Sequence, residues 1–195
     1  MAKYKPIPKQ KRASTSAAKK KGPRVMSGAD KVRMIRIVKL QPKSDVPQPP
    51  QNAQAKRGLS IARILDATTA DALNFGREIV IESAKKFRTG KGLPAVTSKS
   101  WHRDPLRPDA AKRIHESTII ARDEQDTPIS KAKAVFISCD REDWCYRWEY
   151  ACATYGATRI MYGNGAPPVI TNPQEVPGCC KHLVALLRYV RDKGI

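Results

Sequence analysis

All five cysteines of this 195-residue chain lie in its last third, and this clustering constrains the fold more than any other feature of the sequence. They are Cys139, Cys145, Cys152, Cys179 and Cys180, with His182 two residues after the last of them. An odd number of cysteines argues against a closed set of disulfides. Thiolates and imidazoles are zinc ligands, so the pattern favours a small domain built around a metal ion.

The secondary structure expected around the cysteines decides which of them can meet. Residues 132–139 alternate and are rich in β-formers, which predicts a strand ending at Cys139. Residues 144–155 carry apolar side chains at helical spacing. A last helix is expected to open at Pro177-Gly178. Its apolar stripe consists of Leu183, Leu186, Leu187 and Val190.

The helical spacing separates two of the cysteines. Cys145 and Cys152 lie seven residues apart, roughly 10 Å of helix rise, which is too far for both to bind one zinc ion. Cys180 and His182 can converge only if the last helix starts at or just after them. The predicted ligands are Cys139, Cys145, Cys180 and His182, with Cys179 as the alternative to Cys180 and Cys152 as the less favoured member. Buried core thiols or a disulfide are the competing interpretations.

The segment Cys180-Lys181-His182-Leu183, at a helix start and after upstream cysteines, resembles the SWIM type of zinc-binding motif. The resemblance implies Zn²⁺ bound by upstream cysteines together with Cys180 and His182. In the usual SWIM pattern the first two cysteines stand one residue apart, whereas Cys139 and Cys145 are farther apart. The choice of upstream ligands therefore stays open.

The same third of the chain is similar to virion structural proteins of tailed bacteriophages. The similarity lies in Tyr146-Arg147-Trp148-Glu149-Tyr150-Ala151, Tyr162-Gly163-Asn164-Gly165, Pro167-Pro168, Thr171-Asn172-Pro173 and Pro177-Gly178. It implies a structural subunit of a phage tail, baseplate or neck, present in several copies in a symmetric assembly with other virion proteins and assembled in the host cytoplasm. Some phage tail-tip proteins carry an iron–sulfur cluster bound by C-terminal cysteines, so the resemblance implies a [4Fe-4S] cluster as the alternative to Zn²⁺.

The N-terminal 30 residues form a basic arm whose composition does not favour independent folding. No acidic residue precedes Asp30. The formal net charge of the whole chain is +19, which points to nucleic acid or an acidic neighbouring protein as a partner. The predicted partner-binding residues are Lys3, Lys5, Lys9, Lys11, Arg12, Lys19, Lys20, Lys21 and Arg24.

The middle of the chain is expected to be mainly helical. Residues 31–55 predict a strand (31–40) followed by a proline-rich linker. Residues 56–108 predict a helical segment that runs to Arg88, with caps at Ser60 and Thr69. An irregular loop is expected from residue 94. A short helix is expected at 109–115 and strands at 118–122 and 159–162. The strands 118–122 and 132–139 are expected to form a hairpin that presents Cys139.

Together these elements predict an α+β fold with four segments. They are the basic arm (1–30), the strand and linker (31–55), the helical segment and loop (56–108) and a small metal-stabilised domain of a hairpin and two helices (109–195). The isolated His102 and His115 are interpreted as structural, so no catalytic set is expected. No stretch approaches the roughly 20 apolar residues of a membrane span. A virion subunit is the preferred function, and a nucleic-acid or ribonucleoprotein-binding protein with a zinc-finger-like module is the alternative.

Overall fold

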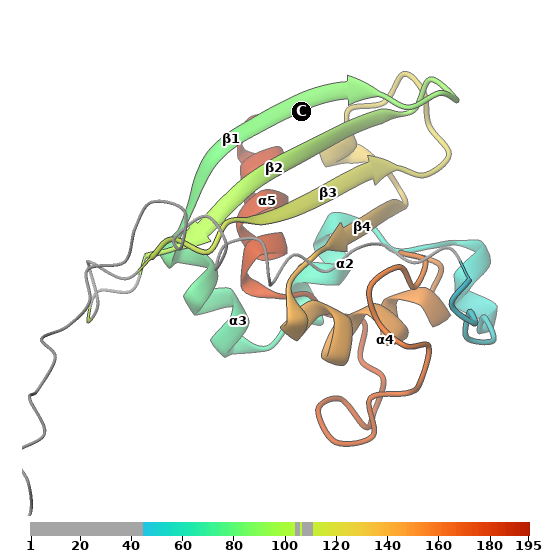
Figure 1. Cartoon of the computed structure of the whole chain (residues 1–195). Coiled ribbons are helices and arrows are strands. Elements are labelled where there is room, and N and C mark those ends of the chain that lie inside the picture. The colour runs from blue at the N-terminus through green and yellow to red at the C-terminus, as the bar shows by residue number, and fades with distance from the viewer. Residues whose placement is uncertain (1–44, 104–105, 107–110) are drawn as a thin grey trace, which may run out of the picture. The chain divides into compact units, whose positions relative to one another are not determined.

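The core of the fold is a four-stranded antiparallel sheet. The computed structural model describes residues 45–103, 106 and 111–195. The strands, β1 (Ile79–Arg88), β2 (Pro94–His102), β3 (His115–Ala121) and β4 (Val135–Cys139), lie side by side in the order of the chain (Figure 1). The predicted α+β class is therefore confirmed. Among the described residues, no helix is long and apolar enough to cross a membrane.

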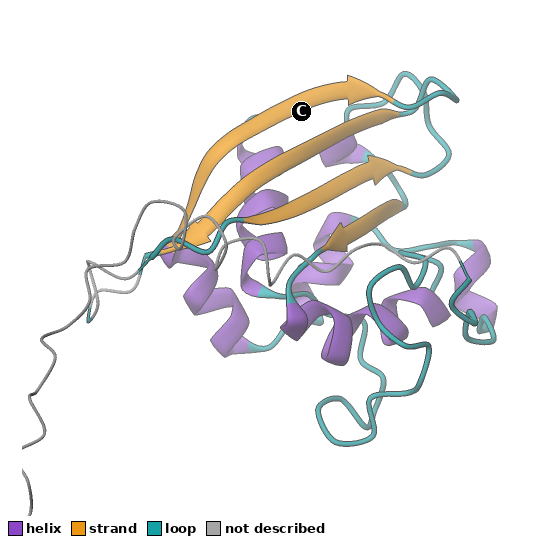
Figure 2. Cartoon of the chain, viewed as in Figure 1, coloured by secondary structure: helices purple, strands orange, loops and turns teal. Residues whose placement is uncertain are grey.

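The helices are short apart from the last one, and Figure 2 shows them beside and below the sheet. The α-helices are α2 (Ile61–Asp66), α3 (Ala70–Phe75), α4 (Glu149–Thr154) and α5 (Lys181–Asp192). One-turn helices occur at η1 (Ala53–Lys56), η2 (Gly76–Glu78) and η3 (Ile129–Lys131), and η4 (Trp144–Trp148) is a π-helical turn that leads into α4. Both predicted residues occupy the N-cap position, Ser60 before α2 with its hydroxyl accepting from Arg63 N, and Thr69 before α3 without a side-chain hydrogen bond to the helix.

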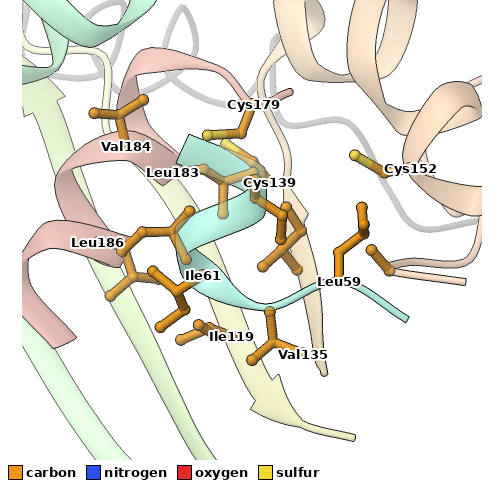
Figure 3. Packing of buried hydrophobic residues seen from close by; sticks show 14 of the residues in the cluster. Leu59, Ile61, Ile119, Val135, Cys139, Cys152, Cys179, Leu183, Val184 and Leu186 are labelled. Atoms are coloured by element: carbon orange, nitrogen blue, oxygen red, sulfur yellow. The ribbon is translucent and has the colours of Figure 1, made fainter. Parts of the chain in front are cut away.

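Helix α5 packs its apolar stripe against one face of the sheet. The predicted stripe residues Leu183, Leu186, Leu187 and Val190 are all fully buried. Figure 3 shows Leu183 and Leu186 in one cluster with Ile119 of β3 and Val135 of β4. Burying a leucine side chain contributes about 1.5–3 kcal/mol, so the contact between α5 and the sheet is a main source of stability.

The last helix begins later than expected, at Lys181. Cys180 is its N-cap, in an extended conformation with φ −75° and ψ 162°. In the segment before it, Gly178 lies against the ring of Trp148. A Cβ atom at Gly178 would stand 2.6 Å from Trp148 Cζ3. This close approach places Cys179 and Cys180 in the core, and the helix start just after Cys180 meets the condition for its convergence with His182.

Two elements differ from the sequence-based expectation for the middle of the chain. Residues 79–88, expected to be helical, form β1, and residues 94–102, expected to be a loop, form β2, which pairs with β1 and β3. The β-branched run Ile79-Val80-Ile81 favours a strand. In β2 the inward positions include Ser98 and Ser100, which are buried but polar and therefore hid the alternation.

The predictions for individual short strands and helices were correct in one case and wrong in others. The hairpin was correct, because β3 and β4 pair antiparallel with Ser117 opposite Cys139. The strand expected at 159–162 is wrong, since this segment is irregular. Residues 111–114 are not helical, and the rest of the helix expected at 109–115, apart from His115 in β3, lies outside the described residues. The basic arm and the strand expected at 31–40 lie outside the described residues too.

The end of the proline-rich segment lies against the domain. The side-chain amide of Gln48 donates to Ile160 O at 3.0 Å and accepts from Ile160 N at 2.8 Å. Asn52 N donates to Thr154 O at 3.0 Å. Residues 45–52 therefore contribute to the fold that contains the cysteines, although they were expected to be a linker.

Candidate metal centre

Three of the four predicted ligands converge in the core. Cys139 ends β4, Cys180 caps α5, and His182 lies in the first turn of α5. Their ligand atoms, two sulfurs and one ring nitrogen, all lie within 4.8 Å of one another. The three residues are 0%, 0% and 2% exposed. The cluster forms because α5 lies on the sheet with its N-terminus beside the end of β4.

This buried group can hold a metal ion. Around tetrahedral zinc, sulfur at about 2.3 Å and nitrogen at about 2.0–2.1 Å lie roughly 3.5–3.8 Å from each other. The ligand atoms of Cys139, Cys180 and His182 lie within 4.8 Å of one another, about 1 Å more than this separation at most. Neither ring nitrogen of His182 has a hydrogen-bond partner among the described residues. A buried polar atom without a partner is costly, and a metal ion bound to one nitrogen would remove part of that cost.

The electrostatics of the group suit metal binding. Burial, together with the nearby His115 and Arg141, lowers the pKa of His182 to about 2, so the imidazole is neutral, as a metal ligand must be. Burial also raises the pKa of Cys139. Burial alone would raise the pKa of Cys180 as well, but hydrogen bonds from Cys139 and the backbone N–H of Leu183 and the charge of Arg141 lower it. Cys180 is therefore the thiol more readily converted to the thiolate that binds metals.

The remaining cysteines make other contacts. Cys179 Sγ lies 3.4 Å from Thr68 Oγ1, and Cys152 Sγ donates to Gly178 O at 3.2 Å. The geometry thus places Cys180, and not Cys179, in the group, and Cys152 packs in the core as expected. Cys145 Sγ donates to Arg141 O at 3.1 Å, outside the compact group. Its role as a ligand stays a prediction. All five cysteines are free thiols.

Sequence reasoning missed His115. Its ring lies 4.6 Å from the ring of His182, centroid to centroid, with an angle of 50° between the planes. His115 Nδ1 is 3.0 Å from Asp140 Oδ1. No local motif signals this contact, because only the pairing of β3 with β4 and the docking of α5 bring the two histidines together.

A buried carboxylate holds the loop that follows α4. Glu149 is fully buried, and its two oxygens accept from the backbone N–H groups of Met161, Tyr162 and Gly163 at 2.7–3.3 Å. Burial raises the pKa of Glu149, while these three donors oppose that shift. No local pattern of residues indicates this role. It also explains why residues 159–162 do not form a strand, since the N–H groups of Met161 and Tyr162 point to a side chain.

The predicted partner-binding residues Lys3, Lys5, Lys9, Lys11, Arg12, Lys19, Lys20, Lys21 and Arg24 lie outside the described residues. Their role stays a prediction. Comparisons of the chain with protein-family models, with curated proteins and with solved structures found no match. The group of Cys139, Cys180 and His182 is therefore the feature of the fold from which a function can be argued.

Proposed function

We propose that the domain described here is a zinc-stabilised structural module. The observation that carries the proposal is the buried group of Cys139, Cys180 and His182. Catalytic zinc sites keep one position open to water or substrate, whereas structural sites are closed by protein ligands. Because the three residues are at most 2% exposed, a substrate has no access to an ion held there. The ion would instead join β4 to the start of α5.

The compact ligand set favours zinc over an iron–sulfur cluster. A four-iron cluster is held by cysteine thiolates, one on each iron, so its ligands are spread around the cluster body. The sulfurs of Cys139 and Cys180 and the imidazole of His182 lie within 4.8 Å of one another, which suits a single ion between them. Two sulfurs with an imidazole are also a donor set typical of zinc.

We further propose that the chain is a structural subunit of a phage particle that binds neighbouring virion proteins. The similarity of the last third of the chain to virion proteins of tailed phages supports this assignment. A second support is the loop between α4 and α5, where Val169 and Ile170 are 71% and 89% exposed. Exposed apolar side chains on an extended loop suit contact with another subunit. In this role the zinc keeps a small core rigid within the assembly.

Mass spectrometry of purified phage particles tests the role in the virion. Particles produced by the phage that encodes the chain should contain it in a fixed ratio to the other tail proteins, in several copies. The ratio should survive a high-salt wash and a second density gradient. A chain that is abundant in the lysate but missing from washed particles would contradict the proposal.

The distribution of charge favours nucleic-acid binding as the second candidate function. Residues 1–44 contain 14 of the 37 basic residues and only one of the 18 acidic residues. Such a segment binds phosphates with release of counterions, so the affinity falls steeply as the salt concentration rises. Binding of the full chain to single- and double-stranded nucleic acid at 50 and 200 mM salt tests this function. A chain that lacks residues 1–44 is the control.

A further inference from the structure

We propose that His115, oriented by Asp140, supplies the fourth ligand of the zinc site. This inference rests on the proposed zinc site and completes it. Structural zinc is almost always four-coordinate, and the compact group offers three ligands. The fourth ligand must come from a residue at the edge of this group. Three side chains are in question, namely His115, Cys145 and Asp140.

The ring of His115 lies where a second imidazole ligand is expected. Two imidazoles on one tetrahedral zinc, each bound at about 2.0–2.1 Å, place their ring centroids roughly 5 Å apart. The centroids of His115 and His182 are 4.6 Å apart, and the rings are tilted by 50° and not stacked. His115 is not a member of the group within 4.8 Å, so its coordination requires a movement of its ring toward that group.

Asp140 prepares His115 for this role. Its Oδ1 lies 3.0 Å from His115 Nδ1 and also accepts from the backbone N–H of Glu116 at 3.0 Å. A carboxylate in this position makes Nδ1 the protonated nitrogen, which leaves Nε2 with its lone pair for a metal. A metal-bound histidine that donates its other N–H to a carboxylate is the common arrangement around protein zinc. Asp140 is 4% exposed and directly follows Cys139.

The competing side chains are engaged elsewhere. The thiol of Cys145 donates to Arg141 O within its own turn, at 3.1 Å. Coordination by Cys145 would require loss of this bond and movement of η4. Asp140 Oδ1 already accepts two hydrogen bonds. The hydrogen bond of the His115 side chain within the described residues is made by Nδ1, so an ion bound at Nε2 replaces no hydrogen bond of this ring.

The surroundings of the site are polar on the side of the sheet. Ser117 lies opposite Cys139 in the pairing of β3 with β4, and Ser98 lies opposite Ser117 in the pairing of β2 with β3. Both serines are buried, and the hydroxyl of Ser117 acts on the Cys139 thiol, whose pKa it lowers against the effect of burial. A metal-bound thiolate at Cys139 is an acceptor that the Ser117 hydroxyl can reach. A thiolate at Cys139 would therefore account for the polar serines Ser117 and Ser98 in the strands beside it.

X-ray absorption at the zinc edge of the full-length, zinc-loaded protein tests the assignment. The expected spectrum is that of two sulfur and two nitrogen ligands, with outer-shell scattering from two imidazoles. His115→Ala should reduce the imidazole count to one and weaken zinc binding by at least about 10–100-fold, the range found when even the partners of ligands are removed. His102→Ala is the matched control, because His102 ends β2 of the same sheet and its Nε2 lies 2.8 Å from Glu78 Oε2 in η2. It should leave the spectrum unchanged.

The outcomes separate the two proposals. A wild-type spectrum with three sulfurs and one imidazole, which loses a sulfur in Cys145→Ser, would overturn the role of His115 and leave the zinc site standing. An oxygen in place of the second imidazole would overturn it as well. A protein that binds no zinc would overturn the proposed site itself, and His115 with it. The wild-type spectrum alone decides between these outcomes, so a variant that does not fold leaves the test intact.

Discussion

Cys180→Ser is expected to release the zinc and to lower the free energy of unfolding by more than about 3 kcal/mol. The apparent binding free energy of a structural zinc ion is about 10–16 kcal/mol in small zinc-dependent folds, and a serine in this place leaves only Cys139 and His182 in the compact group. Because the ion would join β4 to α5, its loss should loosen the main contact of the core. Zinc content and urea denaturation under reducing conditions measure both effects.

Cys179→Ser is the matched control for this variant. Cys179 is the neighbouring residue, is equally buried, and makes its contact with Thr68 and not with the metal group. It should retain one zinc per chain and lose less stability than Cys180→Ser. Equal zinc content in the two variants would contradict the assignment of Cys180 as a ligand.

Glu149→Ala is expected to destabilise the domain by about 3 kcal/mol or more. The substitution leaves the backbone N–H groups of Met161, Tyr162 and Gly163 without their acceptor. Each buried donor left unpaired costs about 1–3 kcal/mol, and water that enters the loop recovers part of this cost. Denaturation in urea gives the loss of stability, and hydrogen exchange should show faster exchange at these three amides.

Two further variants show whether the loss of stability comes from the lost carboxylate acceptor. Glu149→Gln keeps one side-chain oxygen as an acceptor and should cost less than Glu149→Ala. Glu142→Ala removes an exposed carboxylate just before η4 and should change stability by no more than about 0.5 kcal/mol. If Glu149→Ala leaves the exchange of the three amides unchanged, the carboxylate does not hold the loop.

The sequence predicted the elements whose pattern is local. The apolar stripe of α5 could be predicted because Leu183, Leu186 and Val190 repeat at helical spacing. The two caps before α2 and α3 follow from Ser60 and Thr69. Cys180 and His182 were recognised because they stand close together in the chain at a helix start.

The features that were missed depend on contacts between distant segments. Strand β2 carries Ser98 and Ser100 on its buried face, so its alternation was polar and gave no apolar signal. His115 meets His182 only after β3 has paired with β4 and α5 has docked. The burial of Glu149 is decided by the loop that folds over it, and this loop is distant from any local pattern.

Metal analysis of the full-length protein, purified in zinc-containing medium under reducing and anaerobic conditions, tests the central claim most directly. Elemental analysis should find one zinc per chain in a colourless protein, with the metal retained after extensive dialysis. Iron with inorganic sulfide and a brown colour would show that the cysteines hold an iron–sulfur cluster in place of a zinc ion. A folded protein without any metal would contradict the account, and Cys139, Cys180 and His182 would then be core side chains only.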